Sequence, residues 1–320
     1  MKPFQYATAH SIETALDLVA DNGRFFAGGI DVLGELKEGL DAPKILVNVK
    51  ALPETRAITP GDAAWTLGAN VTLAEVAAHP AIRKTFPGLA EAALEVGSPQ
   101  IRNVATLAGN LAQHSRCWYY RHRDTPCLKN GGDFCYARNG NNRHHSLFSG
   151  NTCISPVASN LAVALAALNA RVRVQRQQET RLMGLREFYD MAWYNPMAHH
   201  SLQPTDLILG VEVPTKATAS AYLQVAEKGD FDWALVSCAA AARVEDGRLM
   251  APRVVLGVVA PVPYQNAAVN TLLDGKTLTP ALAAEAAALL LEGAEPRSDN
   301  GYKIPMAKAL VQRTLMRLVA

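Results

Sequence analysis

The segment RFFAGGID, residues 24–31, decides most about the fold. An apolar run ends in two glycines, which predicts a short buried strand followed by a turn. The residues before it (11–23) have helical spacing, with Ser11 as an expected N-cap, and a second helix and strand are expected in residues 32–50. Strand, helix and strand in this order predict a small βαβ unit.

The same turn is a candidate phosphate site, because backbone N–H groups exposed before a helix can bind an anion. A purely structural Gly-Gly turn is an equally good interpretation. The turn matches neither GxGxxG nor the Walker pattern that ends in Gly-Lys-Ser/Thr. An ordinary nicotinamide-binding Rossmann domain is therefore disfavoured.

Length and composition exclude several classes of protein. The chain has 320 residues, 49% hydrophobic and 19% charged, which predicts two globular domains rather than a disordered chain. The net charge of +2 gives no strong attraction to nucleic acid or to an anionic membrane. Apolar runs such as residues 161–170 are too short to span a bilayer, and no signal-peptide core is present. We expect a cytoplasmic protein, or a periplasmic one if a signal-bearing partner exports it.

The pattern along the chain predicts an α+β protein divided at Pro214. We expect a first domain of residues 1–214, with lobes of about 1–57 and 58–214, and a second domain of residues 215–320 that begins with a linker at 215–220. Residues 114–155 interrupt the first domain: they are rich in Asn, Gly, Arg and His and have few aliphatic residues. Such a long aperiodic stretch is typical of a functional loop.

A second candidate ligand-binding stretch is GSPQIRNVATLAGNL, residues 97–111. It mixes small residues, which let a ligand approach the backbone, with side chains that form hydrogen bonds. A polar loop with a β-bulge is the competing interpretation.

The cysteines are the least ordinary feature of the sequence. Four lie within 37 residues, at Cys117, Cys127, Cys135 and Cys153, and a fifth, Cys238, lies in an apolar run where a packing role is expected. Their spacing lacks the close pairs of zinc sites and also differs from compact ferredoxin motifs. The spacing alone is compatible with an iron–sulfur cluster, with a zinc site, and with disulfides or free thiols. We interpret the neighbouring histidines, which could compete as ligands, as solvated: His114, His122, His144 and His145.

Five stretches, in this order, resemble the FAD-binding medium subunit of the molybdenum hydroxylases, the xanthine dehydrogenase family. They are FAGGIDVL (26–33), IRNVATLAGNL (101–111), SNLAVALAALNARV (159–172), FDWALVSCAAA (231–241) and VVLGVVAP (254–261). The resemblance implies a two-lobed FAD-binding domain of the vanillyl-alcohol-oxidase (PCMH) type. A C-terminal α+β domain of the CO dehydrogenase flavoprotein type would follow it.

The Cys-bearing insertion resembles those of bacterial aldehyde oxidoreductase and 4-hydroxybenzoyl-CoA reductase, in which four Cys hold a [4Fe–4S] cluster. This implies Cys117, Cys127, Cys135 and Cys153 as metal ligands. No catalytic residue is implied. The resemblance implies these FAD contacts: Phe26, Ala27, Gly28, Gly29, Ile30, Asp31, Val32, Ala105, Thr106, Gly109, Asn110, Gln113, Ser159, Asn160 and Gln224.

The sequence departs from the family pattern at three positions. Asn160 replaces Asp, Gln224 replaces Lys, and Ala108 replaces Gly. The first two departures remove charges near the expected flavin, so the flavin's potential and its reaction with an acceptor are open.

The resemblance implies an electron-transfer subunit. A large partner would carry the molybdenum cofactor and oxidise an aldehyde, an aromatic or an N-heterocyclic substrate, in a heterotrimer or a dimer of heterotrimers. A small partner would carry two [2Fe–2S] clusters, and electrons would pass between these, FAD and an external acceptor. The alternatives are a stand-alone flavin oxidase of small alcohols and a zinc-tetrathiolate binding protein with a vestigial flavin fold.

Overall fold

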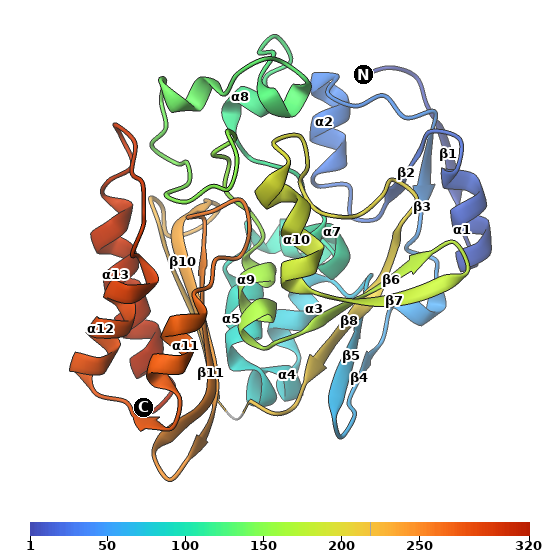
Figure 1. Cartoon of the computed structure of the whole chain (residues 1–320). Coiled ribbons are helices and arrows are strands. Elements are labelled where there is room, and N and C mark those ends of the chain that lie inside the picture. Colours follow the sequence, from blue (N-terminus) through green and yellow to red (C-terminus); the bar gives the residue numbers. More distant parts are fainter. Residues whose placement is uncertain (218) are drawn as a thin grey trace.

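Three β-sheets, each with its own helices, follow one another along the chain (Figure 1). The computed structural model describes residues 1–217 and 219–320, so residue 218 of the predicted linker lies outside the described residues. No helix that it describes is both long and apolar enough to cross a bilayer.

The first lobe contains the predicted βαβ unit. Its parallel sheet has the order β1-β3-β2, and Ser11 caps the first helix by accepting a hydrogen bond from the N–H of Thr14. The elements of this lobe are β1 (Gln5–Thr8), α1 (Ile12–Val19), β2 (Gly23–Phe26), α2 (Val32–Glu38) and β3 (Ile45–Asn48).

The second lobe has an antiparallel sheet of order β4-β5-β8-β6-β7 and a layer of helices. Its strands are β4 (Ile58–Thr59), β5 (Ala64–Gly68), β6 (Arg171–Arg176), β7 (Glu179–Gly184) and β8 (Leu207–Pro214). Its helices are the 3-10 helix η1 (Pro53–Thr55), α3 (Leu73–Ala78), α4 (Pro80–Thr85), α5 (Pro87–Leu94), α6 (Pro99–Val104), α7 (Leu107–Leu111), α9 (Asn160–Ala167) and α10 (Leu185–Tyr194).

Residues 99–111 do not form the polar loop with a β-bulge that was the competing interpretation of this stretch. They form α6 and α7, because two hydroxyl side chains each cap a short helix. Ser98 Oγ accepts from the N–H of Ile101, and Thr106 Oγ1 accepts from the N–H of Gly109.

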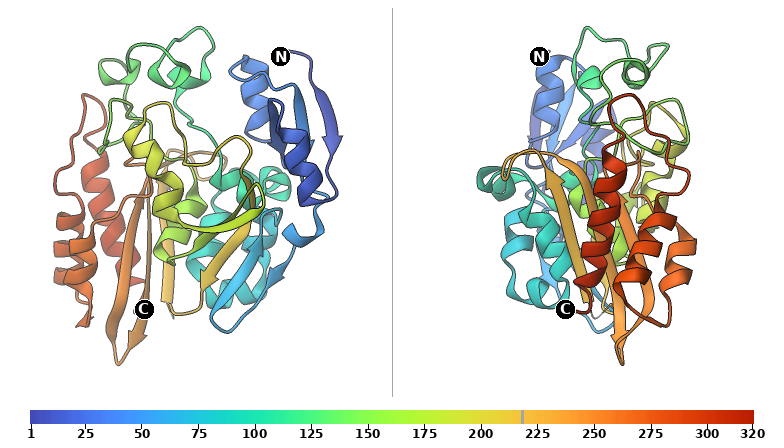
Figure 2. Two further views of the ribbon diagram at one scale, coloured as in Figure 1. Left: turned by 45° about the vertical axis from the view of Figure 1, so that its right-hand side comes forward. Right: turned by 90° about the vertical axis from the view of Figure 1, so that its left-hand side faces the viewer.

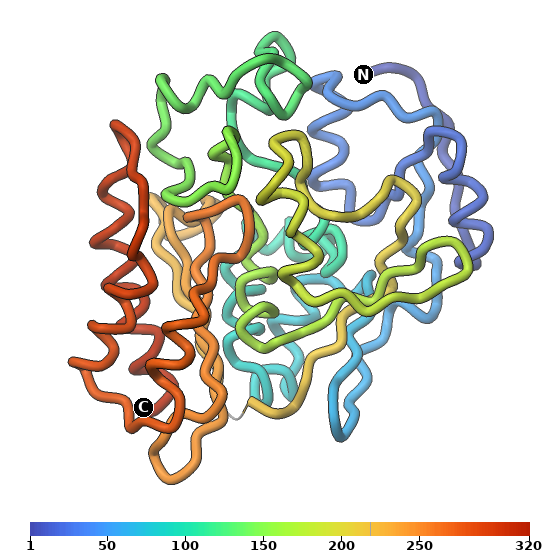
Figure 3. Tube along the Cα trace, in the orientation of Figure 1, coloured from blue at the N-terminus to red at the C-terminus, as the bar shows by residue number. Residues whose placement is uncertain are grey.

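The C-terminal part carries an antiparallel sheet of order β12-β11-β10-β9. Figure 3 shows β8 ending and β9 beginning at the end of the molecule opposite the Cys-rich insertion. The sequence did not predict α11, which Asn266 caps. The elements are β9 (Ala219–Ala226), β10 (Ala234–Glu245), β11 (Arg248–Gly257), α11 (Ala267–Leu273), β12 (Lys276–Thr277), α12 (Pro280–Leu290) and α13 (Lys303–Met316).

Helix α9 joins the second lobe to the C-terminal sheet. All its residues are buried, as expected for a helix that is apolar all round, and it contacts α5 on one side and β10 and β11 on another. Tyr222 and Ala239 of the C-terminal sheet belong to the same hydrophobic core as the second lobe. This shared core holds the two parts together.

The insertion, residues 114–155, lies at one end of the molecule between the first lobe and the C-terminal helices (Figures 1 and 2). Leu147 and Phe148 enter the C-terminal core, and the N–H groups of both residues donate to the carbonyl of Val259. Its short helices are α8 (Trp118–Arg121), η2 (Leu128–Asn130) and η3 (Tyr136–Arg138).

Candidate functional site

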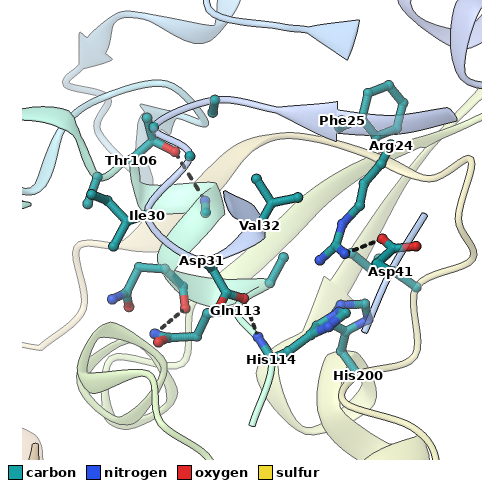
Figure 4. A pocket seen from close by; sticks show the side chains of 18 of the residues that line it. Arg24, Phe25, Ile30, Asp31, Val32, Asp41, Thr106, Gln113, His114 and His200 are labelled. Atoms are coloured by element: carbon teal, nitrogen blue, oxygen red, sulfur yellow. Dashed lines mark hydrogen bonds and ion pairs between the residues drawn. The ribbon is translucent and has the colours of Figure 1, made fainter. Parts of the chain in front are cut away.

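A cavity of about 670 Å³ opens between the two lobes (Figure 4). Its walls are the turn between β2 and α2 (residues 27–32, here called the glycine turn), helix α7, and parts of residues 200–206 and 231–233. Glycines, apolar side chains and a few polar groups line it, which is typical of a site for a large organic ligand. We call it the large cavity.

Most of the FAD contacts implied by the resemblance line the large cavity. Phe26, Ser159, Asn160 and Gln224 do not belong to its lining. Those that do are Ala27, Gly28, Gly29, Ile30, Asp31, Val32, Ala105, Thr106, Gly109, Asn110 and Gln113.

The two glycines of the turn are required for different reasons. A Cβ built on Gly28 would stand 2.2 Å from the carbonyl oxygen of Val104, at the end of α6. Gly29 has a φ of +74°, which L side chains rarely adopt. The turn therefore lies backbone to backbone on α6, and this contact brings residues 26–33 and 101–111 together.

The carboxylate of Asp31 points to the insertion and fixes the turn (Figure 4). Its Oδ2 accepts from the N–H of His114 at 2.8 Å, and its Oδ1 accepts from Nη2 of Arg121 at 2.6 Å. Arg116 Nη2 lies 3.0 Å from the same Oδ1. This role of Asp31 could not be predicted from the sequence, because the partners are more than 80 positions away.

Glu35, one turn into α2, is the fully buried centre of a second ionic group. Arg24 Nη2 lies 2.7 Å from Oε2, while His114 Nδ1 and the Tyr120 hydroxyl lie 2.8 and 2.6 Å from Oε1. Burial opposes ionisation, but the hydrogen bond and charge of His114, followed by the charge of Arg24, hold the pKa of Glu35 well below its usual range.

These carboxylates form an ion-pair network rather than a metal site. Ligand atoms of Asp31, Glu35 and His114 lie within 4.8 Å of one another. The carboxylate oxygens already face the guanidinium groups of Arg24, Arg116 and Arg121, and three cations nearby oppose binding of another.

Asn160 and Gln224, the two residues that replace charged residues of the family pattern, form a hydrogen bond with each other. Asn160 Nδ2 donates to Gln224 Oε1 at 3.0 Å, and Gln224 Nε2 donates to Glu95 Oε2 at 3.1 Å. Ser159 Oγ donates to Asn110 Oδ1 at 2.6 Å, which links this group to the cavity wall. A neutral hydrogen bond thus stands where the family pattern has an Asp and a Lys.

The structure brings the four clustered cysteines together. Cys117, Cys127, Cys135 and Cys153 line one small cavity, here called the cysteine cavity. All five cysteines of the chain are free thiols, and Cys238 lies fully buried in β10, in the C-terminal core. Cys238 is a packing residue, as predicted.

The sulfur atoms are spread more widely than zinc requires. Zn–S bonds of about 2.3 Å in a tetrahedron put the sulfurs about 3.8 Å apart. Over residues 1–217 and 219–320, no three cysteine sulfurs lie within 4.8 Å of one another. A [4Fe–4S] cluster binds each thiolate on a separate iron, which suits a wider arrangement.

The ammonium group of Lys129 lies at the cysteine cavity. Burial raises the pKa of the Cys117 thiol to about 12 and also raises that of Cys153. Lys129 donates to the carbonyls of Pro196 and Ala198 at 3.1 and 2.6 Å, and burial lowers its pKa while the surrounding cysteines raise it. A metal would have to displace protons from these thiols.

His145 contradicts the interpretation of the histidines as solvated. It is 2% exposed, and its Nε2 lies 3.2 Å from Cys117 Sγ. Burial lowers the pKa of His145 to about 4, so its ring is neutral at neutral pH. His122 is exposed as expected, whereas His114 and His144 are half-buried. Sequence cannot reveal His145's position, because residues 142–148 are placed by the distant C-terminal part.

Two consecutive residues of the insertion line the large cavity and the cysteine cavity, one residue each. Arg116 lines the first and Cys117 the second. The Arg116 guanidinium carbon also lies 4.7 Å from the ring centre of Trp233, at the C-terminal wall of the large cavity. The insertion therefore contributes to the walls of both cavities.

Two family profiles match almost the whole chain. The FAD binding domain in molybdopterin dehydrogenase matches residues 2–216, and the CO dehydrogenase flavoprotein C-terminal domain matches residues 220–319. Among solved structures, quinoline 2-oxidoreductase of Pseudomonas putida 86 superposes with a TM-score of 0.76 at 25% identity, covering 100% of this chain and 98% of the other. Carbon monoxide dehydrogenase of Hydrogenophaga pseudoflava has the same fold, with a TM-score of 0.77 at 23% identity, over 99% of this chain and 98% of the other.

Among characterised proteins, the aldehyde oxidoreductase FAD-binding subunit PaoB of Escherichia coli K12 is 32% identical over 100% of this chain and 98% of its own length. The carbon monoxide dehydrogenase medium chain of Hydrogenophaga pseudoflava is 26% identical over 98% and 96%. Together with the glycine turn against α6, these matches show that the chain belongs to the FAD-binding medium subunits of the molybdenum hydroxylase family of oxidoreductases.

Proposed function

We propose that this chain is the FAD- and [4Fe–4S]-containing electron-transfer subunit of a molybdenum-dependent hydroxylase or dehydrogenase. Its partners would be a small [2Fe–2S] subunit and a large molybdenum-cofactor subunit that oxidises an aldehyde or an aromatic N-heterocycle. The observation that carries the proposal is that consecutive residues, Arg116 and Cys117, line the large cavity and the cysteine cavity. When bound, FAD supplies a centre that takes up two electrons and releases them singly or in pairs.

The large cavity offers FAD backbone and hydrogen-bonding groups. Gly28 and Gly29 hold the glycine turn against α6 and line the cavity, so that backbone N–H groups before α2 would face a pyrophosphate. Thr106, Asn110 and Gln113 add hydrogen-bonding groups on the wall formed by α7 and its ends.

Ser159, Asn160 and Gln224 would lie behind the residues that line the large cavity. Ser159 holds the side chain of Asn110, and Asn160 holds Gln224. We therefore propose that these three support the cavity wall and the flavin's surroundings. Phe26 would support the glycine turn by packing against it, since its ring lies within 2.9 Å of a Cβ built on Gly29.

The cysteine cavity suits a [4Fe–4S] cluster better than zinc. It offers four thiols, wide sulfur spacing and a shell that includes Tyr119, Tyr120 and Tyr136. Aromatic walls exclude water, which protects a cluster and helps to set its potential. A redox role for the proposed cluster is supported by the fact that consecutive residues, Arg116 and Cys117, line the two cavities.

The proposed domain boundary at Pro214 and Thr215 is supported by the end of β8 and by the limits of the two family profiles. We also keep the cytoplasm as the proposed location, with export on a partner as the alternative. The stand-alone oxidase is disfavoured, because relatives that match over their whole length, such as PaoB, are named FAD-binding subunits of an oxidoreductase.

A reductive titration of the anaerobically purified complex tests the proposal. We expect flavin absorption to bleach and a reduced [4Fe–4S] signal to appear in the EPR spectrum, with the FAD released intact by acid. Flavin without iron would remove the cluster from the proposal. Zinc without flavin would favour a structural binding protein instead.

A further inference from the structure

We infer that His145 is a positioning residue for the cysteine cavity: its Nε2–H donates a hydrogen bond to the sulfur of Cys117 and raises the reduction potential of the cluster bound there. The inference rests on the proposed [4Fe–4S] cluster. It starts from the 3.2 Å distance between Nε2 and Sγ, which is a normal length for a hydrogen bond to sulfur.

The tautomer follows from the surroundings of the ring. A neutral imidazole has one N–H, and His145 is 2% exposed. Nε2 faces the sulfur of Cys117. A thiolate bound to the proposed cluster carries no proton and can only accept a hydrogen bond, so the Nε2 that faces it carries the proton.

The backbone on both sides of His145 is fixed by the C-terminal part of the chain. Asn300 Nδ2 donates to the carbonyls of His145 and Ser146 at 3.2 and 3.1 Å. The buried ammonium of Lys303 donates to the carbonyl of His144 at 3.1 Å. These contacts span more than 150 positions and leave His145 little freedom to move.

Aromatic neighbours fix the ring itself. The Trp118 ring lies 5.7 Å away at 71°, and the Tyr119 ring lies 6.2 Å away at 41°. Both belong to α8, which begins directly after Cys117. The donor and the sulfur are therefore held by one packed unit.

A hydrogen bond to a ligating sulfur changes the redox equilibrium in a known direction. Reduction adds one electron to the cluster and increases the negative charge on its sulfurs. A fixed donor stabilises the reduced form more than the oxidised form and so raises the potential. The burial of His145 strengthens this effect, because a hydrogen bond is stronger where the local dielectric constant is low.

The test compares three variants of the complex by EPR-monitored redox titration. His145→Leu removes the donor, His145→Gln restores an N–H donor, and His144→Leu is the matched control, since His144 contacts Glu227 and Trp118 but no cysteine. We expect the cluster potential to become more negative in His145→Leu, to recover at least in part in His145→Gln, and to stay at the parent value in His144→Leu. An unchanged potential in His145→Leu with full iron would overturn the inference.

A second measurement applies if His145→Leu fails to keep its iron. In the parent complex labelled with ¹⁵N-histidine, hyperfine spectroscopy of the reduced cluster should detect one weakly coupled nitrogen that His144→Leu retains. Strong coupling would mean that His145 ligates iron directly, and absent coupling would mean no contact; either result overturns the inference. A parent complex without iron would instead overturn the proposed cluster itself.

Discussion

Arg121 Nη2 donates to Asp31 Oδ1 across 2.6 Å, so a side chain of the cysteine-rich insertion holds the glycine turn of the large cavity. Both side chains are mostly buried, at 18% and 15% exposure. The insertion and the turn are therefore parts of one structure, although about 90 positions separate them.

Arg121→Leu should weaken FAD binding. Asp31 would keep Arg116 and the N–H of His114 but lose its shortest ion pair, and the turn would lose its rigid position. We expect about a tenfold higher Kd, or about 1.4 kcal/mol. The measurement is fluorescence titration of flavin-stripped protein with FAD. Arg123→Leu is the control, because that residue is 68% exposed and pairs only with its neighbour Asp124; equal Kd values for both variants and the parent would contradict the coupling.

Gly28→Ala should release flavin and destabilise the protein. A methyl group there meets the Val104 carbonyl at 2.2 Å, so the turn and α6 must separate. We expect a loss of about 1–3 kcal/mol in the free energy of unfolding. Gly34→Ala is the matched control on α2, where the nearest atom lies at 3.9 Å and alanine favours the helix. Urea unfolding and flavin content should change only for Gly28, and full flavin in a folded Gly28→Ala protein would refute the placement of the turn.

The local pattern of the sequence predicts much of this fold. Ser11 caps α1 as expected, the run before Gly28 is a strand, and Cys238 is in the core. These features depend on neighbours within a few positions. The clustered cysteines also meet as the resemblance implied.

What sequence could not predict depends on contacts between distant segments. The burial of His145 requires Asn300 and Lys303, and the orientation of Asp31 requires Arg121. Residues 99–111 looked like a loop because their helices are only six and five residues long and depend on caps at Ser98 and Thr106. Short helices carry too little periodicity to be recognised.

Lys303 should make stability depend on pH above neutrality. Its side chain is fully buried, its ammonium donates to the carbonyls of His144 and Val258, and burial lowers its pKa to about 7. In the unfolded chain the pKa is about 10.4, so between these values the folded protein binds fewer protons and its stability rises with pH. We expect a rise of about 1 kcal/mol per pH unit from pH 7 to pH 10.

Urea unfolding at several pH values measures this slope. The Lys303→Met protein should be less stable than the parent at pH 9, because two buried carbonyls lose a donor. Its free energy of unfolding should also lack the rise with pH that Lys303 produces in the parent. Parallel profiles for parent and variant would show that Lys303 does not titrate in this range.

Asn160 and Gln224 should behave as a coupled pair. Asn160 is 8% exposed, so Asn160→Asp alone buries a charge near Glu95 and should cost about 1–2 kcal/mol. Gln224→Lys in the same chain restores the ion pair of the family pattern and should recover most of that loss. The measurement is a double-mutant cycle by urea unfolding; additive effects would show that the two side chains do not interact.

The most direct test of the central claim is the iron and FAD content of the anaerobically purified complex with Cys127→Ser or Cys238→Ala in this chain. Both residues are buried, but Cys127 lines the cysteine cavity and Cys238 lies in the C-terminal core. We predict that Cys127→Ser loses about four iron atoms per chain, the content of one [4Fe–4S] cluster, and loses far less FAD. Cys238→Ala should keep both and lose only packing stability. Iron retained in Cys127→Ser, or zinc in place of that iron in the parent, would contradict the account.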